Sequence, residues 1–156
     1  MATPSIKPIL LLIILTLLSA FCNAQSTLNV NGRLTREQSL INGVFRLTMQ
    51  TDCNLVLYDN GRAIWATNTA GRGTGCSVVM RENGDLAVYL PNNAPIWLSN
   101  TARGNANYYL TLQSDRNLVI YAPGGTPIWA TNTQNRMNGI IANETAYKDD
   151  MVIKQA

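Results

Sequence analysis

The sequence predicts an all-β protein of three small antiparallel sheets arranged around a pseudo-three-fold axis. A nine-residue frame occurs three times, as QTDCNLVLY at 50–58, RENGDLAVY at 81–89 and QSDRNLVIY at 113–121. A tryptophan marker follows each copy, and the markers are 32 residues apart (97 − 65 and 129 − 97) at Trp65, Trp97 and Trp129. Copies at constant spacing predict similar units that stack, because one such unit cannot bury its apolar face alone.

The opening 24 residues have the pattern of an export signal. Lys7 is followed by an apolar run, Ile9 to Leu18, and by a small-residue cleavage region that ends at Ala24. The alternative is a membrane anchor, but the run is well short of the roughly 20 residues that span a bilayer. We therefore predict a signal peptide over 1–24, a mature chain that starts near Gln25, and passage through the secretory pathway to an extracellular or vacuolar location.

Cysteine and histidine counts narrow the chemistry. Loss of the leader removes Cys22 and leaves Cys53 and Cys76, which we expect to form one disulfide in an oxidising compartment. The chain has no histidine, which excludes Ser-His-Asp and Cys-His catalysis, and a metal site would need more ligands than remain. We expect no metal and no cofactor. The net charge of +3 falls to +2 without Lys7, and the arginines are scattered, so charge does not indicate nucleic acid or an anionic membrane as partner.

Beyond Leu28 the composition favours strands. Short stretches rich in β-branched, aromatic and aliphatic residues occur at Phe45–Met49, Leu55–Tyr58, Ser77–Met80 and Tyr108–Leu112. Asn-Gly, Pro-Asn-Asn and Pro-Gly-Gly turn signals separate such stretches, and no 3.6-residue apolar period persists. A repeat of about 32 residues has room for three or four strands of about five residues. We expect the Trp of each repeat at or near the shared axis, between the sheets.

The last segment, 134–156, has neither a Trp marker nor a repeat. It carries the glycosylation sequon Asn143-Glu144-Thr145. A disordered tail or a removed propeptide fits this composition better than a fourth sheet. The predicted plan is a leader over 1–24, one repeat domain over 25–133 and a tail over 134–156.

The nine-residue frame has two interpretations. Asp-x-Asn closes turns, and the second copy has Asn83-Gly84, a strong hairpin signal. A turn alone, however, needs neither the Gln two residues earlier nor the Tyr four residues later. Strand alternation places one set on the outward face, namely Gln50, Asp52, Asn54, Val56 and Tyr58. The other set suits the core side, namely Thr51, Cys53, Leu55 and Leu57.

The outward set combines two amides, a carboxylate and a phenol around a small apolar patch. Such a set suits a neutral polyol, because a sugar hydroxyl can donate to a carboxylate while it accepts from an amide. The third copy repeats the same letters at Gln113, Asp115, Asn117, Val119 and Tyr121. We therefore interpret the frame as a carbohydrate-binding site as well as a turn.

Three tandem copies of this frame, with IWxxNT after each, resemble the monocot mannose-binding lectins, the bulb-type family similar to snowdrop agglutinin. The resemblance covers about Leu28 to Thr133 and includes the Cys53–Cys76 pair. It implies a β-prism II fold of three four-stranded antiparallel sheets around a pseudo-three-fold axis. It also implies metal-free mannose binding at each intact frame, homodimers or higher oligomers made by exchange of the C-terminal strand, and a trimmed C-terminal propeptide.

The resemblance also assigns a role to each residue of an intact frame. Asp52 and Asn54 would hold the axial O2 of mannose, Gln50 would reach O3, Tyr58 would reach O4, and Val56 would touch the ring carbons. The third copy would repeat these roles with Asp115, Asn117, Gln113, Tyr121 and Val119.

The middle copy departs from this pattern. It has Arg81 for Gln, Asn83 for Asp, Asp85 for Asn and Ala87 for Val, and it retains only Tyr89. We predict that this site is lost or altered, because Arg81 adds a long cation, Ala87 removes an apolar contact, and the acid and the amide are exchanged.

The expected function is that of a secreted lectin, without enzymatic activity, that recognises terminal α-mannose of glycans and glycoproteins in plant defence or storage. One rival is a glycosidase, which needs two carboxylates about 5 to 10 Å apart. Each intact frame supplies one, and the Asp59 that follows the first frame is matched by Ala122 after the third. The other rival is a lectin-like storage or taste-modifying protein with vestigial sites, since the family includes members with eroded frames.

Overall fold

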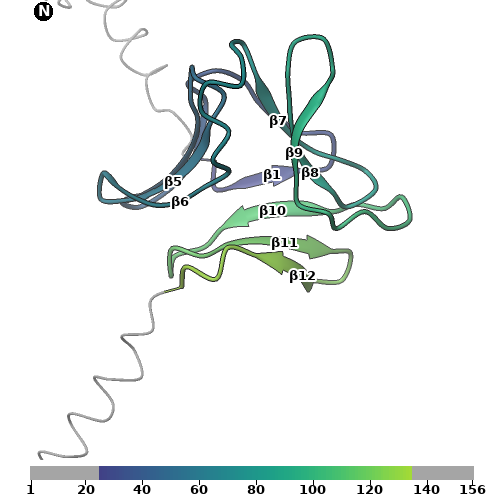
Figure 1. The fold of residues 1–156 in the computed structure, drawn as a ribbon. Helices are drawn as coiled ribbons and strands as arrows, with labels where there is room; N and C mark the ends of the chain where they lie inside the picture. The colour runs from purple at the N-terminus through teal and green to yellow at the C-terminus, as the bar shows by residue number, and fades with distance from the viewer. Residues whose placement is uncertain (1–24, 135–156) are drawn as a thin grey trace, which may run out of the picture.

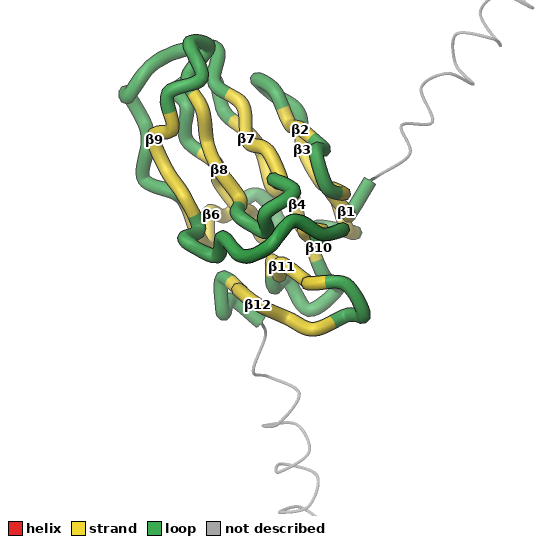
Figure 2. Tube along the Cα trace, turned by 90° about the vertical axis from the view of Figure 1, so that its right-hand side faces the viewer, coloured by secondary structure: helices red, strands yellow, loops and turns green. Residues whose placement is uncertain are grey.

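The computed structural model describes residues 25–134, and the three sheets that they form are the walls of a prism (Figure 1). The predicted leader, the sequon at Asn143 and the rest of the predicted tail beyond Gln134 lie outside the described residues. Every regular element in the described part is a strand (Figure 2), so no helix there could cross a membrane. The strands are β1 (Thr27–Asn29), β2 (Arg33–Leu34), β3 (Ser39–Asn42), β4 (Phe45–Met49), β5 (Leu55–Asp59), β6 (Arg62–Ala66), β7 (Ser77–Met80), β8 (Leu86–Tyr89), β9 (Pro95–Leu98), β10 (Tyr109–Leu112), β11 (Leu118–Ala122) and β12 (Thr126–Ala130).

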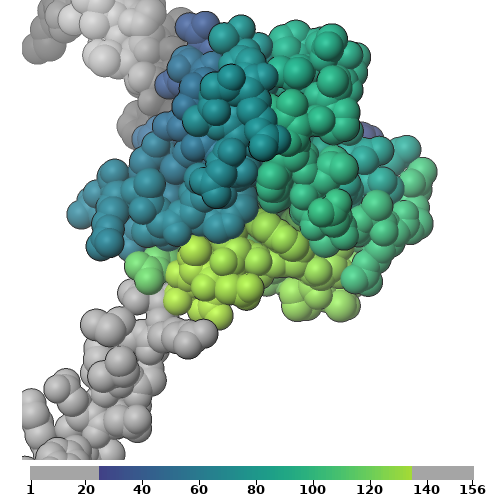
Figure 3. All heavy atoms as spheres, in the orientation of Figure 1, coloured from purple at the N-terminus to yellow at the C-terminus, as the bar shows by residue number. Residues whose placement is uncertain are grey.

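Each sheet is four-stranded and antiparallel, as the sequence and the resemblance predict. The first sheet has the order β3-β4-β5-β6, the middle sheet β2-β7-β8-β9, and the third sheet β1-β10-β11-β12. The four stretches predicted as strands are confirmed as β4, β5, β7 and β10, with ends that differ by at most one residue. The three repeats occupy adjoining sectors of one molecular face (Figure 3).

The N-terminal segment supplies one strand to every sheet. β1 pairs with β10, β2 with β7, and β3 with β4. The second and third repeats therefore contribute three strands each, and the short segment 27–34 completes both of their sheets. Because residues 27–42 are hydrogen-bonded to all three sheets, this N-terminal segment links the sheets to one another.

The third sheet is complete within one chain. β12 pairs with β11, with Val119 opposite Ala130 and Ile120 opposite Trp129. The strand exchange implied by the resemblance would replace this pairing by the same pairing between two chains, and it stays a prediction.

The core lies between the three walls and comes from their central strands. Alternate residues of the two middle strands of each sheet have no exposed surface: Leu47, Met49, Leu55, Leu57, Val78, Met80, Leu86, Val88, Leu110, Leu112, Leu118 and Ile120. Burial of an aliphatic side chain of this size stabilises a fold by about 1.5–3 kcal/mol. The predicted inward position of Leu55 and Leu57 is confirmed.

The three tryptophans meet at the axis. The ring centroids are 5.9 Å apart for Trp65 and Trp97, 5.8 Å for Trp65 and Trp129, and 6.1 Å for Trp97 and Trp129. The interplanar angles of 74° to 80° are edge-to-face, the arrangement in which the positive ring edge meets a negative ring face. The predicted axial position of the tryptophans is confirmed.

Candidate carbohydrate-binding site

Each frame begins as a tight turn between two core strands. In the first copy the N–H of Gln50 donates to the carbonyl of Asn54 at 2.9 Å, and the N–H of Cys53 donates to the carbonyl of Gln50 at 3.2 Å. Cys53 has a φ of 71°, and the equivalent Gly84 and Arg116 have 86° and 69°. The left-handed backbone at this one position closes the turn. The turn interpretation is therefore correct, and the side chains around it carry a further arrangement.

The frame aspartate stabilises the turn with one oxygen and leaves the other free. Oδ1 of Asp52 accepts the N–H of Asn54 at 3.0 Å, and Oδ1 of Asp115 accepts that of Asn117 at 2.9 Å. Both aspartates are exposed, and their Oδ2 atoms have no hydrogen-bond partner within residues 25–134. Each intact frame thus presents a fixed, unused carboxylate oxygen to solvent.

The frame asparagine is held from behind by the second marker. Oδ1 of Asn54 accepts the hydroxyl of Thr67 and the N–H of Thr69, both at 3.2 Å. Thr69 also donates its hydroxyl to the carbonyl of Cys53 at 2.6 Å, and Asn68 between the two threonines has a φ of 56°. Because the carbonyl oxygen is occupied, the Nδ2 donor of Asn54 is the group left for a ligand.

The third copy repeats this support in detail. Oδ1 of Asn117 accepts the hydroxyl of Thr131 at 3.0 Å and the N–H of Thr133 at 3.3 Å. Sequence reasoning missed the threonines and treated IWATNT only as a repeat marker. The signal was present, because a hydroxyl residue occurs at both positions in all three copies.

The frame glutamine and tyrosine form a pair. Nε2 of Gln50 donates to the hydroxyl of Tyr58 at 2.6 Å, and Gln113 donates to Tyr121 at 2.8 Å. The tyrosine oxygen accepts in this bond, so its proton remains for a ligand, and so does Oε1 of the glutamine. The strand register shifts directly before the tyrosine in all three repeats, between Leu57 and Tyr58 in the first. Bulges of this kind re-aim a side chain next to a site.

Strand alternation predicted an outward set and a core-side set of frame residues, and the two predictions have different outcomes. Val56 and Val119 lie outside the central core cluster, as expected for the opposite face, yet each is only 4% exposed. Thr51 was predicted on the core side, and this prediction is wrong, since Thr51 is exposed. The reason is that residues 51–53 form the turn, so strand alternation starts only at Leu55.

The middle frame keeps the turn and exchanges its donors and acceptors. Oδ1 of Asn83 accepts the N–H of Asp85 at 3.2 Å, as the aspartate does elsewhere. Oδ1 of Asp85 accepts the Ser99 hydroxyl at 2.8 Å and the Thr101 N–H at 3.2 Å. The middle frame therefore has an amide nitrogen, Nδ2 of Asn83, where the intact frames have a carboxylate oxygen, and a carboxylate oxygen, Oδ2 of Asp85, where they have an amide nitrogen.

Two further changes fill the middle site. Nη1 of Arg81 lies 3.6 Å from Oδ2 of Asp85, so the cation occupies the place of the glutamine. Val56 and Val119 face Ala66 and Ala130 on the neighbouring strand, whereas Ala87 faces Leu98. The large side chain has moved across the strand pair, which the sequence analysis did not anticipate.

The turn of each frame is anchored at its left-handed residue by a different device. Cys53 forms the predicted disulfide with Cys76, with 5.2 Å between their Cα atoms. At Gly84 a side chain would meet the Tyr108 ring at 2.9 Å, so this glycine is required by contact as well as by φ. Arg116 forms an ion pair with Asp59 of the first sheet at 2.9 Å. All three turns are thereby fixed before any ligand arrives.

The structure brings together every predicted residue of the first and third frames. Each intact frame offers a carboxylate oxygen, an amide N–H₂, an amide oxygen and a phenolic proton within one turn and one strand. Within residues 25–134 no three potential His, Cys, Asp or Glu ligands gather in one place. The described groups are suited to hydrogen-bonding a ring of neutral hydroxyls.

No protein-family model matches the chain. The chain is 43% identical over 70 residues to Curculin-2 of Molineria latifolia, a match that covers 45% of this chain and 44% of that protein. The chain spans about half the length of the curated relatives it matches, among them the mannose-specific lectins of Galanthus nivalis and Narcissus pseudonarcissus.

Two solved structures match over nearly their whole length. A monomeric monocot mannose-binding lectin from Gastrodia elata has a TM-score of 0.70 and 44% identity, over 71% of this chain and 100% of that chain. The mannose-specific agglutinin of snowdrop (Galanthus nivalis), in complex with methyl-α-D-mannoside, has a TM-score of 0.62 and 48% identity, over 71% and 99%. The fold is the predicted β-prism II, and the chain belongs to the monocot mannose-binding (bulb-type) lectin family.

Proposed function

We propose that this protein is a lectin that binds terminal α-mannose at the first and third frames. The observation that carries the proposal is that these two frames share three sets of side-chain hydrogen bonds: Asp to backbone, Asn to two threonines, and Gln to Tyr. Two sites with the same unused donors and acceptors, on different sheets, are unexpected if the polar residues only close turns.

The chemistry of the free groups fits a sugar with an axial hydroxyl. Oδ2 of Asp52 accepts and Nδ2 of Asn54 donates, so together they suit one hydroxyl that does both, which we assign to O2 of mannose. Gln50 then reaches O3, Tyr58 donates to O4, and Val56 meets the ring carbons. Four or five exposed hydrogen bonds of about 1 kcal/mol each predict a binding free energy of about −4 kcal/mol, near a millimolar constant.

The biological setting of the proposal rests on the leader-like opening and on the relatives. We infer a secreted protein, extracellular or vacuolar, that acts in plant defence or storage by binding mannose-containing glycans and glycoproteins. We infer a binding protein rather than an enzyme, because each intact frame supplies one carboxylate, and Asp59, which follows the first frame in the sequence, is paired with Arg116 and has Ala122 as its counterpart. A homodimer or higher oligomer formed by exchange of β12 would multiply the sites.

Calorimetric titration of the mature protein with the methyl α-glycosides of mannose and glucose tests the proposal. Mannose should bind at two sites per chain, and glucose, whose O2 is equatorial, should bind too weakly to measure. Equal binding of the two sugars would overturn the assignment of O2 to Asp52 and Asp115.

A second candidate is a lectin-like storage or taste-modifying protein without working sites. The middle frame favours it, because there the donors and acceptors are exchanged and Arg81 fills the place of the glutamine. The likeness to Curculin-2 is of similar extent to the likeness to the snowdrop lectin. Agglutination that methyl mannoside inhibits would favour the lectin, and absence of both agglutination and mannoside binding would favour this alternative.

A further inference from the structure

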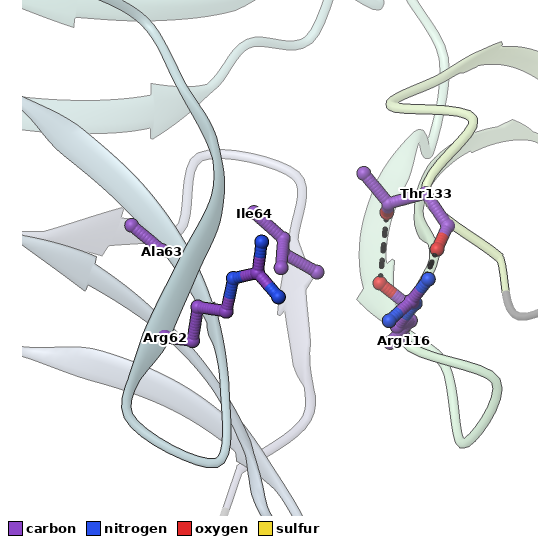
Figure 4. A pocket seen from close by; sticks show the side chains of 5 residues that line it. All are labelled: Arg62, Ala63, Ile64, Arg116 and Thr133. Carbon is purple, nitrogen blue, oxygen red and sulfur yellow. Dashed lines mark hydrogen bonds between the residues drawn. The ribbon is translucent and has the colours of Figure 1, made fainter.

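A cleft of about 350 Å³ lies at the corner where the first sheet meets the third (Figure 4). Arg62, Ala63 and Ile64 of β6 form one side, and Arg116 and Thr133 form the other. Arg62 extends from the β6 strand into the space between these two sides. The cleft therefore has a cation on each side.

The charges at this corner break the three-fold repeat. Counted from the tryptophan, Arg62 corresponds to Ala94 and Thr126, and counted along the frame, Arg116 corresponds to Cys53 and Gly84. Asp59 corresponds to Leu90 and Ala122 in the same way. All three charged residues thus occur at one corner, and the equivalent positions of the other two corners are neutral.

The two arginine side chains differ in their hydrogen-bond partners. Arg116 donates from Nε to the carbonyl of Thr133 at 2.7 Å and from Nη1 to Asp59 at 2.9 Å. The Arg62 side chain is exposed, and its guanidinium has no hydrogen bond or ion pair to any group of residues 25–134. Asp59 is therefore paired with Arg116, and the Arg62 guanidinium is the cation of this cleft that has no partner among residues 25–134.

The cleft adjoins the third frame through Thr133. The N–H of Thr133 donates to Oδ1 of the frame residue Asn117 at 3.3 Å, and its carbonyl accepts from Arg116, which lines the cleft. Arg116 itself lies between the frame residues Asp115 and Asn117. A sugar held by this frame has the cleft as its neighbour.

We propose that this corner is an anion subsite of the third frame, which receives a carboxylate or phosphate carried next to a frame-bound mannose. The proposal rests on mannose binding at the frames and adds a charged substrate class to one of them. The planar guanidinium group binds carboxylates and phosphates through paired N–H donors. All of the guanidinium donors of Arg62 are unused within residues 25–134. The first frame has the same mannose-binding residues but Cys53 and Ala94 at the corresponding corner positions. The cation at that corner, Arg72, differs from Arg62 in that its Nη1 donates to the carbonyl of Ile96 at 3.1 Å.

The two frames allow the test to be made within one chain. Asp52→Ala leaves only the third frame, and Asp115→Ala leaves only the first. Calorimetry on each variant measures the affinity for methyl mannoside and for three probes. Two probes are anionic, a glucuronosyl-mannoside and a methyl mannosyl phosphate. The third is a neutral glucosyl-mannoside with the same linkage as the glucuronosyl-mannoside. At low salt, at least one anionic probe should bind about 3- to 10-fold tighter than methyl mannoside at the third frame, and the gain should shrink in high salt. The neutral disaccharide and the first frame should show no such gain.

Substitution of the free cation completes the test. Arg62→Gln, made in the Asp52→Ala background, should bring the ratio of the anionic to the neutral affinity close to one. Arg103→Gln is the matched control, because Arg103 is an exposed cation whose backbone is bound to the middle frame, and it should leave that ratio unchanged. Equal affinity for all probes at the third frame, or an equal loss with Arg103→Gln, would overturn the subsite while methyl mannoside binding still stands. No binding of any mannoside would instead remove the proposed function.

Discussion

Arg81 and Asp85 form an ion pair at the two positions that hold glutamine and asparagine in the intact frames, with 3.6 Å between Nη1 and Oδ2. Asp85 is only 3% exposed, and its Oδ1 accepts from Ser99 and Thr101 as an asparagine oxygen would. Its second oxygen brings a negative charge into a nearly dry position, where a charge needs a partner. Arg81 supplies that partner, so the two departures from the frame depend on each other.

Replacement of Asp85 should therefore affect stability more than mannose binding. Asp85→Ala removes the acceptor of two half-buried donors and the partner of Arg81, which should lower the free energy of unfolding by about 1–3 kcal/mol. Asp85→Asn keeps Oδ1 and should cost less. Denaturant unfolding of both variants measures the difference, with mannose titration as a second readout that should stay near the wild-type value. Equal stability of Asp85→Ala and the wild type would show that these hydrogen bonds contribute little.

The fold was predictable because the residues that define the repeat are those whose side chains point into the core. Alternation of apolar residues at Leu55, Leu57 and their equivalents gave the core faces, and the constant spacing of the tryptophans placed them at the axis. The assignment of strands to sheets was not predictable from the repeat. The N-terminal segment completes all three sheets, and its strands β1 and β2 are three and two residues long, too short for a hydrophobic period to be recognised.

The residues of the site could be predicted from the sequence, but the hydrogen bonds among them could not. Spacing placed the Gln, Asp, Asn and Tyr of a frame together, but it could not tell which oxygen each would use. That depends on Thr67 and Thr69, which approach from the next hairpin strand and take the asparagine oxygen. Equally, Leu98 opposite Ala87 is a contact across two strands, so it becomes visible only once the register is known.

The threonines behind the frame should orient the asparagine. Thr67→Val removes the hydroxyl that donates to Oδ1 of Asn54 and accepts the N–H of Leu55, and the shape is nearly conserved. The loss of a buried partner should cost about 1–3 kcal/mol of stability and should weaken mannose at the first frame more than at the third. Calorimetry in the Asp115→Ala background isolates the first frame, and Thr131→Val is the matched control there. Unchanged affinity with Thr67→Val would refute the orienting role.

The disulfide should support the first frame as well as the fold. Cys53 lies in the left-handed position of the turn between Asp52 and Asn54, and its bridge to Cys76 closes a separation of 23 residues. Loop-closure entropy predicts a stabilisation of about 3 kcal/mol. The Cys53→Ser/Cys76→Ser variant should therefore unfold at lower temperature and bind mannose less tightly at the first frame than at the third. Mass spectrometry of the non-reduced protein should show one bridged peptide pair, and two free thiols would contradict the structure.

Binding stoichiometry should distinguish the two intact frames from the middle one. Asp52→Ala and Asp115→Ala should each remove about half of the mannose sites, because each carboxylate belongs to a separate sheet. The double variant should remove essentially all of them. Since linked weak sites gain roughly 10² to 10⁴ in avidity, agglutination should fall more steeply than sugar binding in either single variant. Binding that persists in the double variant would place a working site at the middle frame.

Restoration of the middle frame is the most demanding prediction. Arg81→Gln, Asn83→Asp and Asp85→Asn together return each donor and acceptor to its place, and Ser99 and Thr101 are already positioned to hold the new asparagine. Ala87→Val alone should overpack the site against Leu98, at a cost of about 1–3 kcal/mol, so Leu98→Ala must accompany it. The five changes should raise the stoichiometry from two mannose sites per chain to three. The same protein without Leu98→Ala is the control, and it should be less stable and bind at two sites. A fully folded variant with all five changes that still binds only two sugars per chain would contradict this prediction. That result would show that the exchanged donors and acceptors and the Leu98 side chain do not explain the loss of the middle site.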